Sequence, residues 1–191
     1  MKKTLFFIWE LFKIALIALA IVMPIRYFLF QPFLVKGESM IPNFEDGDYL
    51  IVDELSYRFR SPARGEIIIF NYAEGTSQGL VKNRLIKRVI GLPGETIEIK
   101  EGKISIYKDN EQQILDESNY IPFSLKTSGN ILVTLNEDEY FVLGDNRPFS
   151  KDSRIFGVLN EEEIIGKVFF RAWPIDDIKK FEAPSYRELI D

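Results

Sequence analysis

The sequence predicts a mostly β protein, in which one N-terminal membrane helix precedes an antiparallel β-sheet domain. Two observations support this fold class. Residues 5 to 30 are almost wholly apolar, and after them helical periodicity gives way to short apolar or alternating runs separated by turn residues. A hydrophobic fraction of 46% over 191 residues is enough for one globular core.

The N-terminal segment is interrupted only by Glu10, Lys13 and Arg26. Its uncharged run, residues 14 to 25, is shorter than the roughly 20 residues that cross a bilayer. Glu10 and Lys13 can pair on one helix face, and Arg26 can extend towards the interface, so we expect one tilted span from about residue 6 to 28. A cleavable signal peptide, which lacks its small-residue cleavage site here, and a buried core helix are the alternatives.

Charge divides the chain. The first 36 residues carry five Lys or Arg against one Glu, which leaves −9 on the remainder of a chain whose net charge is −5. The cations on either side of the span weakly favour a cytoplasmic N-terminus. We therefore expect an anchor at 1–30, an extracytoplasmic β-rich domain at 31–175 and a polar tail at 176–191. No basic cluster suggests a nucleic-acid partner.

The β domain is predicted from eight short runs. The clearest hairpin joins "TIEIK" and "KISIY" around Glu101 and Gly102, and residues 108–130 lack a pattern and are expected to form a loop. Helical character is expected only at 160–165 and in the tail, in "IDDIKKF" and "YRELI". The expected strands lie at 48–54, 66–72, 84–90, 96–100, 103–108, 130–135, 139–144 and 167–173.

A candidate nucleophile, Ser39, follows a glycine in "GESMIP". The chain has neither histidine nor cysteine, so it has no disulfide, no thiolate metal site and no histidine base. The proton of Ser39 must then pass to a carboxylate or to a neutral lysine. In "NRLIKRVIGLPGE" both strand faces are apolar around a charge, so periodicity does not decide whether Lys87 or Arg88 is buried. Lys87 is chosen on chemistry, because only lysine can lose its proton when desolvated.

A second polar cluster, "GDNRPFSKDSR" at 144–154, directly follows an apolar strand and could orient such a lysine. Its candidate groups are Ser150, Asp152, Ser153 and Arg154. Each of these pieces taken alone is typical of an ordinary turn or a solvated strand.

Together these segments resemble bacterial type I signal peptidases of the Gram-positive-like, single-anchor type, which are Ser-Lys serine proteases. The resemblance rests on "GESMIP", "GDYLIVDE", "KRVIGLPGE" and "GDNRPFSKDSRIFG" in this order after an anchor, and extends to about Trp173. It implies an antiparallel β-sheet catalytic domain of the signal-peptidase type.

The resemblance also implies roles for particular residues. Ser39 is the nucleophile, Lys87 is the general base, and the Ser150 hydroxyl orients the lysine amine. Asp152 and Arg154 brace the site through a salt bridge. The remaining supporting residues that it implies are Arg147, Gly37 and Met40.

The implied reaction is acyl transfer on secreted preproteins, with cleavage after small residues of an Ala-X-Ala-like site. We expect backbone oxyanion donors, with the Ser39 N–H among them, because Gly37 has no hydroxyl. Phe33, Val35 and Ile86 are candidate walls of the substrate pockets. No metal or organic cofactor is implied. The implied setting is a monomer in the cell membrane, near the secretion translocase.

Three departures from the family pattern stand out: Asn43 replaces the usual Thr, Glu95 the usual Asp, and Pro148-Phe149 the common Asp-Asn. Two other functions remain open. One is a self-cleaving, repressor-like Ser-Lys protease, which the anchor and the acidic balance disfavour. The other is a catalytically silent, membrane-tethered β domain that acts as an interaction protein.

Overall fold

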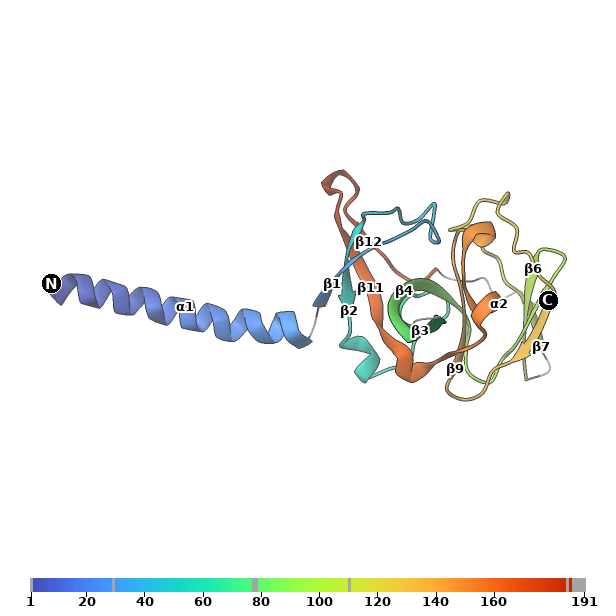
Figure 1. The fold of residues 1–191 in the computed structure, drawn as a ribbon, viewed down its shortest axis with the longest axis horizontal. Helices are drawn as coiled ribbons and strands as arrows, with labels where there is room; N and C mark the ends of the chain where they lie inside the picture. Colours follow the sequence, from blue (N-terminus) through green and yellow to red (C-terminus); the bar gives the residue numbers. More distant parts are fainter. Residues whose placement is uncertain (1, 29, 77–78, 110, 185, 187–191) are drawn as a thin grey trace.

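The structure is a computed structural model that describes residues 2–28, 30–76, 79–109, 111–184 and 186. One long helix, α1 (Lys2–Phe28), extends from a β-sheet domain as a separate rod (Figure 1). The domain contains a large sheet beside the helix and a small sheet at the far end, so the predicted mostly β, antiparallel fold class is confirmed.

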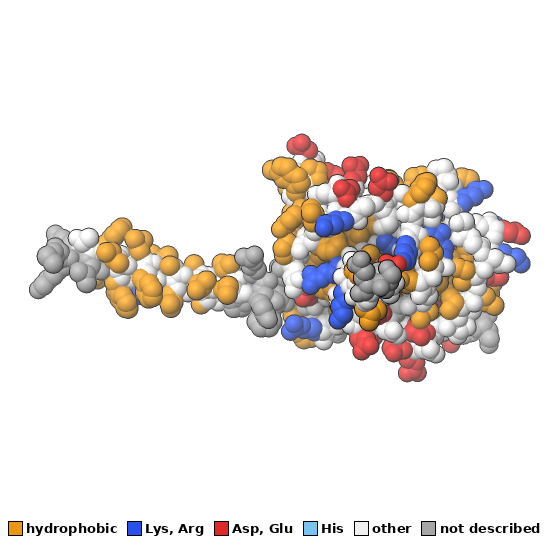
Figure 2. Space-filling view, in the orientation of Figure 1, with side chains coloured by type: hydrophobic (Ala, Val, Ile, Leu, Met, Phe, Trp, Pro, Cys, Tyr) orange, Lys and Arg blue, Asp and Glu red, His pale blue; other side chains and the backbone are white. Residues whose placement is uncertain are grey.

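Helix α1 exposes apolar side chains along its length (Figure 2), and Lys13 donates to Glu10 at 2.7 Å as the spacing predicted. Within the described residues, however, no helix combines the length and the apolarity needed to cross a membrane. The expected span is therefore not confirmed.

The large sheet is antiparallel throughout and follows the order β1-β2-β11-β3-β4-β9-β10, with β12 paired to β11. Strand β4 is long and lies near its centre, and the candidate base is on this strand. The strands are β1 (Phe30–Leu34), β2 (Tyr49–Asp53), β3 (Ile67–Thr76), β4 (Gly79–Gly91), β9 (Glu139–Leu143), β10 (Leu159–Asn160), β11 (Ile164–Trp173) and β12 (Lys179–Lys180).

The small sheet has the order β7-β6-β5-β8. The predicted hairpin is confirmed: β5 and β6 pair in register around Glu101 and Gly102, whose φ angles of 52° and 81° suit a tight hairpin turn. Isoleucines of this hairpin pack against Phe141 and Leu143 of β9, which joins the two sheets. The strands are β5 (Thr96–Lys100), β6 (Lys103–Lys108), β7 (Glu111–Ile114) and β8 (Ile131–Thr134).

The eight predicted strands all form, and three other expectations hold only in part. The 108–130 segment contains β7, because residues 111–114 pair with β6. Residues 160–165 contain a 3-10 helix of three residues, η3 (Glu161–Glu163), between β10 and β11. The tail forms a short 3-10 helix, η4 (Ile175–Asp177), and then β12, and Phe181 packs against Phe44 of the core with ring centroids 4.4 Å apart. Residues 187–190 of "YRELI" lie outside the described residues.

Candidate active site

Ser39 lies in a tight turn between β1 and β2. Gly37 has a φ of +84°, a conformation that favours glycine, and its N–H donates to Asp46 Oδ1 at 2.6 Å. Met40 is buried, and its carbonyl accepts the N–H groups of Asn43 and Phe44 at 2.9 and 3.0 Å. The turn is thus closed on both sides of the serine, which fixes where the hydroxyl points.

Lys87 approaches this hydroxyl from β4. Its Nζ donates to Ser39 Oγ at 2.7 Å and to the Ile86 carbonyl at 2.8 Å, and the residue is 3% exposed. Burial lowers the pKa of the Lys87 amine to about 8, although Asp152 and Asp145 act in the opposite direction by favouring the charged form. The two residues singled out from the sequence therefore form a hydrogen-bonded pair in a largely dry position.

Arg88, the neighbour that periodicity could not distinguish from Lys87, is equally buried. It donates to both Asp145 oxygens at 2.8 and 2.6 Å and to the Gly65 carbonyl at 2.9 Å. The centroid of the Tyr120 ring lies 4.0 Å from the guanidinium carbon of Arg88. Both cations are therefore inside the domain, with Lys87 at the serine and Arg88 in an ion pair with Asp145.

The loop after β9 brings together Asp152 and Arg154 in a salt bridge, as the resemblance implied. Asp152 accepts Nε and Nη2 of Arg154, each at 2.8 Å, and the Gly144 N–H at 3.0 Å. It also caps the short helix α2 (Ser153–Phe156). Arg154 donates in turn to the Arg147 carbonyl at 2.6 Å, so this ion pair holds the loop closed.

Ser150 differs from the expectation. The residue is buried near Gly144, but its hydroxyl has no hydrogen-bond partner among the described residues, and the expected bond to the lysine amine is not formed. The second acceptor of Lys87 Nζ is the Ile86 carbonyl instead. Ser153 serves the backbone, since its Oγ accepts the Val142 N–H at 2.9 Å.

Two asparagines tie the serine turn to this loop: Asn146, which the sequence did not indicate, and Asn43, one of the three departures from the family pattern. The Asn146 N–H donates to the Ser39 carbonyl at 3.0 Å, and its side-chain amide donates to the Glu38 carbonyl at 2.9 Å. Asn43 donates to Asp145 Oδ2 and to the Tyr120 carbonyl, both at 2.8 Å. The departure at Asn43 therefore supplies a bridge, because one amide has two donors.

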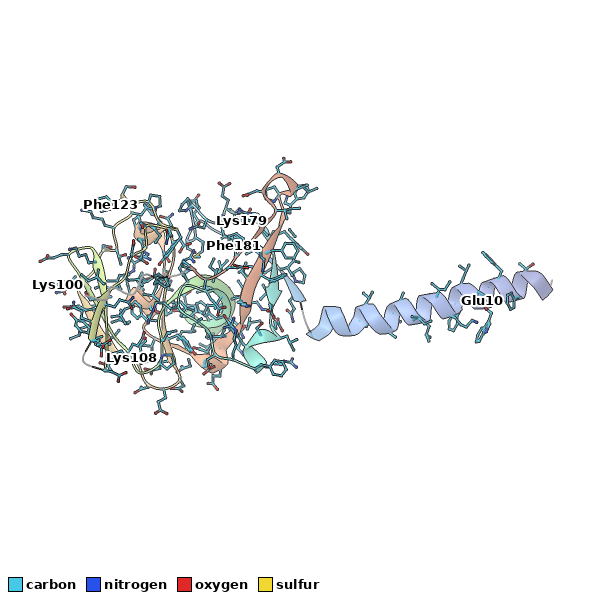
Figure 3. All side chains as sticks on the ribbon, turned by 180° about the vertical axis from the view of Figure 1, so that it is seen from behind. Glu10, Lys100, Lys108, Phe123, Lys179 and Phe181 are labelled. Atoms are coloured by element: carbon cyan, nitrogen blue, oxygen red, sulfur yellow. The ribbon has the colours of Figure 1, made fainter. Side chains whose placement is uncertain are left out.

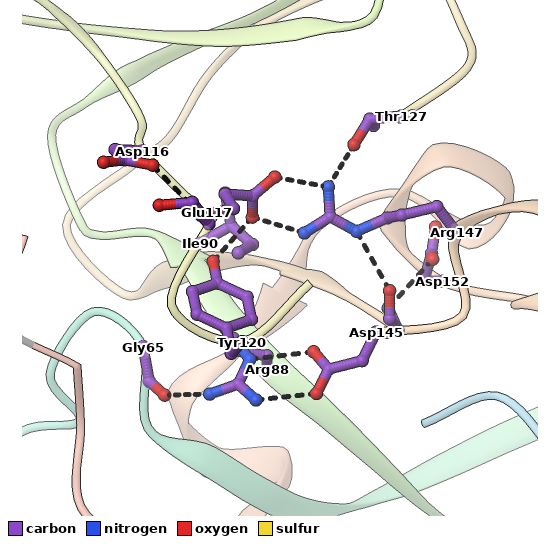
Figure 4. Close-up of polar contacts among 12 residues, drawn as sticks. Gly65, Arg88, Ile90, Asp116, Glu117, Tyr120, Thr127, Asp145, Arg147 and Asp152 are labelled. Atoms are coloured by element: carbon purple, nitrogen blue, oxygen red, sulfur yellow. Dashed lines mark hydrogen bonds and ion pairs between the residues drawn. The ribbon is translucent and has the colours of Figure 1, made fainter. Parts of the chain in front are cut away.

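Figure 4 shows that the segment 115–127, between β7 and β8, supports the same loop. Glu117 accepts both terminal nitrogens of Arg147, one at 2.7 Å, and the Tyr120 hydroxyl at 2.6 Å. Arg147 also donates to Thr127 Oγ1 and, from Nε, to the Gly144 carbonyl at 3.0 Å. Arg147 was expected to support the site, but no local sequence signal indicates its partner Glu117, 30 positions away.

The other two departures have separate structural roles. Glu95 accepts Arg64 at 2.8 and 2.6 Å and the Leu92 N–H at 2.8 Å, so its longer side chain closes the turn before β5. Pro148 and Phe149 form the 3-10 turn η2 (Arg147–Phe149), in which the Phe149 side chain is exposed.

Gly144 is expected to tolerate no side chain. A Cβ there would lie 2.5 Å from the Ser39 carbonyl oxygen and closer still to the Ser150 hydroxyl. Because the obstacle is partly backbone, we expect Gly144→Ala to displace the serine turn and lower kcat by about a hundredfold, the scale on which small misplacements act. The control is Gly75→Ala, where no atom lies within 4 Å of the new Cβ. Full activity in purified Gly144→Ala would contradict this prediction.

A cleft of about 270 Å³ opens beside Ser39 and Lys87. Of the predicted pocket walls, Phe33 and Ile86 line it, whereas Val35 lies in the hydrophobic core with Met40. Strand β9 pairs with β4 over Arg88–Gly91, and in the described structure the same edge of β4 has no strand partner before Arg88. The residues that line the cleft are Phe33, Leu34, Lys36, Ser39, Lys82, Asn83, Arg84, Leu85, Ile86 and Lys87.

The family model described as "Signal peptidase, peptidase S26" matches residues 8–173, a range that includes the serine turn, β4 and the loop after β9. The chain belongs to this family. It is therefore a hydrolase of peptide bonds, and the resemblance inferred from its motifs is confirmed.

Several named relatives are similar over most of the chain. It is 33% identical to a probable signal peptidase I-2 of Synechocystis over 95% of this chain and 81% of that one. It is 31% identical to signal peptidase IB of Staphylococcus aureus, covering 85% and 88%. A crystal structure of a signal peptidase I from Enterococcus faecalis aligns with a TM-score of 0.42 at 31% identity, covering 56% of this chain and 97% of that one.

Proposed function

We propose that the protein is a membrane-bound serine endopeptidase that removes N-terminal signal peptides from secreted preproteins by Ser-Lys chemistry. The observation that carries the proposal is the 2.7 Å contact between Lys87 Nζ and Ser39 Oγ, in a position where burial lowers the pKa of the amine to about 8. A nucleophile within hydrogen-bond reach of a base is the arrangement that acyl transfer requires. The silent β-domain alternative offers no reason to keep a lysine desolvated in this way.

In the proposed reaction, neutral Lys87 takes the Ser39 proton while Oγ attacks the scissile carbonyl carbon. The resulting ammonium then gives this proton to the departing amine, which leaves an ester on Ser39. Water, activated by the same amine, hydrolyses the ester. The Ser39 N–H is the proposed oxyanion donor. Asn146 supports this assignment, since it holds the carbonyls on both sides of that N–H group.

The preprotein would bind as an extended strand along the open edge of β4. Peptides that add to a free strand edge gain backbone hydrogen bonds, and alternate side chains enter pockets. Phe33 and Ile86 would form apolar walls in the cleft. Small residues one and three positions before the cut are then favoured, because a larger side chain finds no room.

The first test is incubation of the purified, detergent-solubilised protein with a secreted preprotein, with the products mapped by mass spectrometry. Cleavage after a small residue at the end of the signal peptide by wild type, and none by Ser39→Ala, is the expected result. A folded wild type that leaves the preprotein intact, or Ser39→Ala that cuts it as fast, would refute the proposal.

The rate is expected to rise with pH. The base must be uncharged, and the pKa of Lys87 is lowered from 10.5 to about 8, so the active fraction increases as pH rises through about 8 and falls tenfold per unit well below it. The measurement is kcat/KM against pH from 6 to about 10 with one peptide substrate. A profile that is flat between pH 6 and 9 would exclude Lys87 as the titrating base.

The proposal places α1 in the cell membrane as a single-pass anchor, with the N-terminus in the cytoplasm and the β domain outside. Its support is the row of exposed apolar side chains on α1 and the cations at its start. We expect the full chain to resist extraction from membranes by alkaline carbonate and a chain that begins at residue 31 to be released. Release of both forms would contradict the anchor.

A further inference from the structure

Every charged side chain that the structure describes in the lining of the cleft is basic. Lys36, Lys82 and Arg84 join Lys87 there, and the described lining contains no carboxylate. This stands out in a chain with 29 acidic and 24 basic residues. A cleft lined by charge of one sign concentrates the electrostatic potential and attracts groups of the opposite sign.

Two of these cations lie at a defined distance along β4 from Lys87. Lys82 and Arg84 precede it by five and three residues and share the opposite face of the strand, the face of Ile86. At about 3.3 Å per residue they lie roughly 16 and 10 Å along the strand from Lys87. The edge of β4 is open over this stretch, so a substrate strand there would pass beside both.

The charges are available to a ligand. Lys36, Lys82 and Arg84 are exposed, and within the described part of the chain Lys36 and Lys82 form no ion pair. Arg84 makes a 3.5 Å contact with Gln31 and has Glu54 within electrostatic range, but Glu54 does not line the cleft. The net charge presented to the cleft is therefore positive.

We propose that Lys36, Lys82 and Arg84, the cationic row, form a subsite for an acidic substrate side chain three to five residues from the scissile bond. The inference rests on the proposed function, because it takes the cleft beside Ser39 as the peptide site. The row makes preproteins that carry Asp or Glu near the cut preferred substrates and disfavours those with Lys or Arg there. Anionic lipid headgroups are a different ligand; the shared cleft with Ser39 favours the peptide.

The test uses two series of three peptides that share one cleavage site. Within a series the peptides differ only by Glu, Gln or Lys at one position, which lies three to five residues before the scissile bond in one series and after it in the other. In one series we expect wild type to cut the Glu peptide about three- to tenfold faster, by kcat/KM, than the Lys peptide at low salt. At about 0.5 M salt the ratio should approach one. In Lys82→Glu the ratio should fall, because the net charge of the row drops from +3 to +1. The ratio of kcat/KM for two substrates does not depend on the fraction of folded enzyme, so it can be measured even in a partly unstable variant.

The matched control is Lys100→Glu, the same charge change on the small sheet, at the opposite end of the molecule from α1 (Figure 3). This variant should leave the ratio unchanged.

Binding of the same peptides to Ser39→Ala, measured by fluorescence anisotropy, separates the two proposals. A Glu preference in binding without wild-type cleavage supports the row and refutes the proposed function. Equal treatment of all three peptides by wild type overturns the row. The proposal is also overturned if Lys82→Glu keeps the full Glu preference but no longer binds phosphatidylglycerol vesicles. That result would assign the cationic row to lipid headgroups.

Discussion

Replacement of Lys87 by methionine is expected to abolish cleavage, with kcat lowered by at least about a thousandfold while the protein stays folded. Methionine retains much of the length and apolar packing of lysine but cannot accept the Ser39 proton. The side chain is nearly fully buried, so no solvent-exposed base replaces it. The measurement is preprotein cleavage by wild type and variant at equal folded concentration.

The same substitution should raise stability. Burial lowers the pKa of the Lys87 amine from 10.5 to about 8, which costs the folded state roughly 3 kcal/mol below pH 8 at 1.4 kcal/mol per unit. This cost shrinks as pH rises from 8 towards 10.5, where the unfolded chain also loses the proton. Lys87→Met should therefore increase the free energy of unfolding at pH 7 and much less near pH 10. Lys100→Met, on an exposed side chain, serves as the control. A folded Lys87→Met that cleaves the preprotein as fast as wild type would refute the catalytic assignment.

Asp145→Ala is expected to cost about 3 to 5 kcal/mol of unfolding free energy, because Arg88 is then left as an uncompensated buried charge. Asp145 is fully buried and accepts two bonds from Arg88 and one from Asn43. The serine turn loses one of its ties to the loop after β9, so kcat should fall as well. Thermal and urea unfolding measure the first effect, and cleavage at a temperature well below the transition measures the second.

Two comparisons make this prediction specific. Asp145→Asn keeps the size of the side chain and one acceptor oxygen, and it should lose less than the alanine variant. Asp138→Ala removes an exposed carboxylate from the turn before β9. It should change the free energy of unfolding by no more than about 0.5 kcal/mol and leave kcat unchanged. Equal stability of Asp145→Ala and Asp138→Ala would show that the Arg88 pair contributes little.

The central strands could be predicted because their signal is local. "EIIIFNY" and "TIEIK" carry the apolar runs or alternation of strands, and β3 and β5 form where expected. The strands that were missed, β1, β7, β10 and β12, are short or polar, and each forms by pairing with the edge of a neighbouring strand. Their conformation depends on tertiary pairing. In the same way Lys179 and Lys180, which were expected to be helical, extend the sheet because they pair with β11.

In the candidate site, too, some residues could be predicted from the sequence and others could not. Ser39 and Lys87 could be chosen because the absence of histidine and cysteine leaves few bases, and chemistry excluded Arg88. The partners Glu117, Tyr120 and Asn146 could not be found, since each lies far along the sequence from the group it holds. Ser150 illustrates the converse: the resemblance assigned its hydroxyl a hydrogen bond to the lysine amine, and the structure buries the residue without that bond.

The segment 115–127 joins two strands of the small sheet, yet Glu117 and Tyr120 contact the arginines that support the serine turn. We therefore expect the small sheet and the serine turn to unfold together. Unfolding of the segment 115–127 with the small sheet would remove Glu117 from Arg147 and the Tyr120 ring from Arg88, so activity should fall with it. Amide exchange in the small sheet therefore measures catalytic competence, although no residue of that sheet lines the cleft beside Ser39.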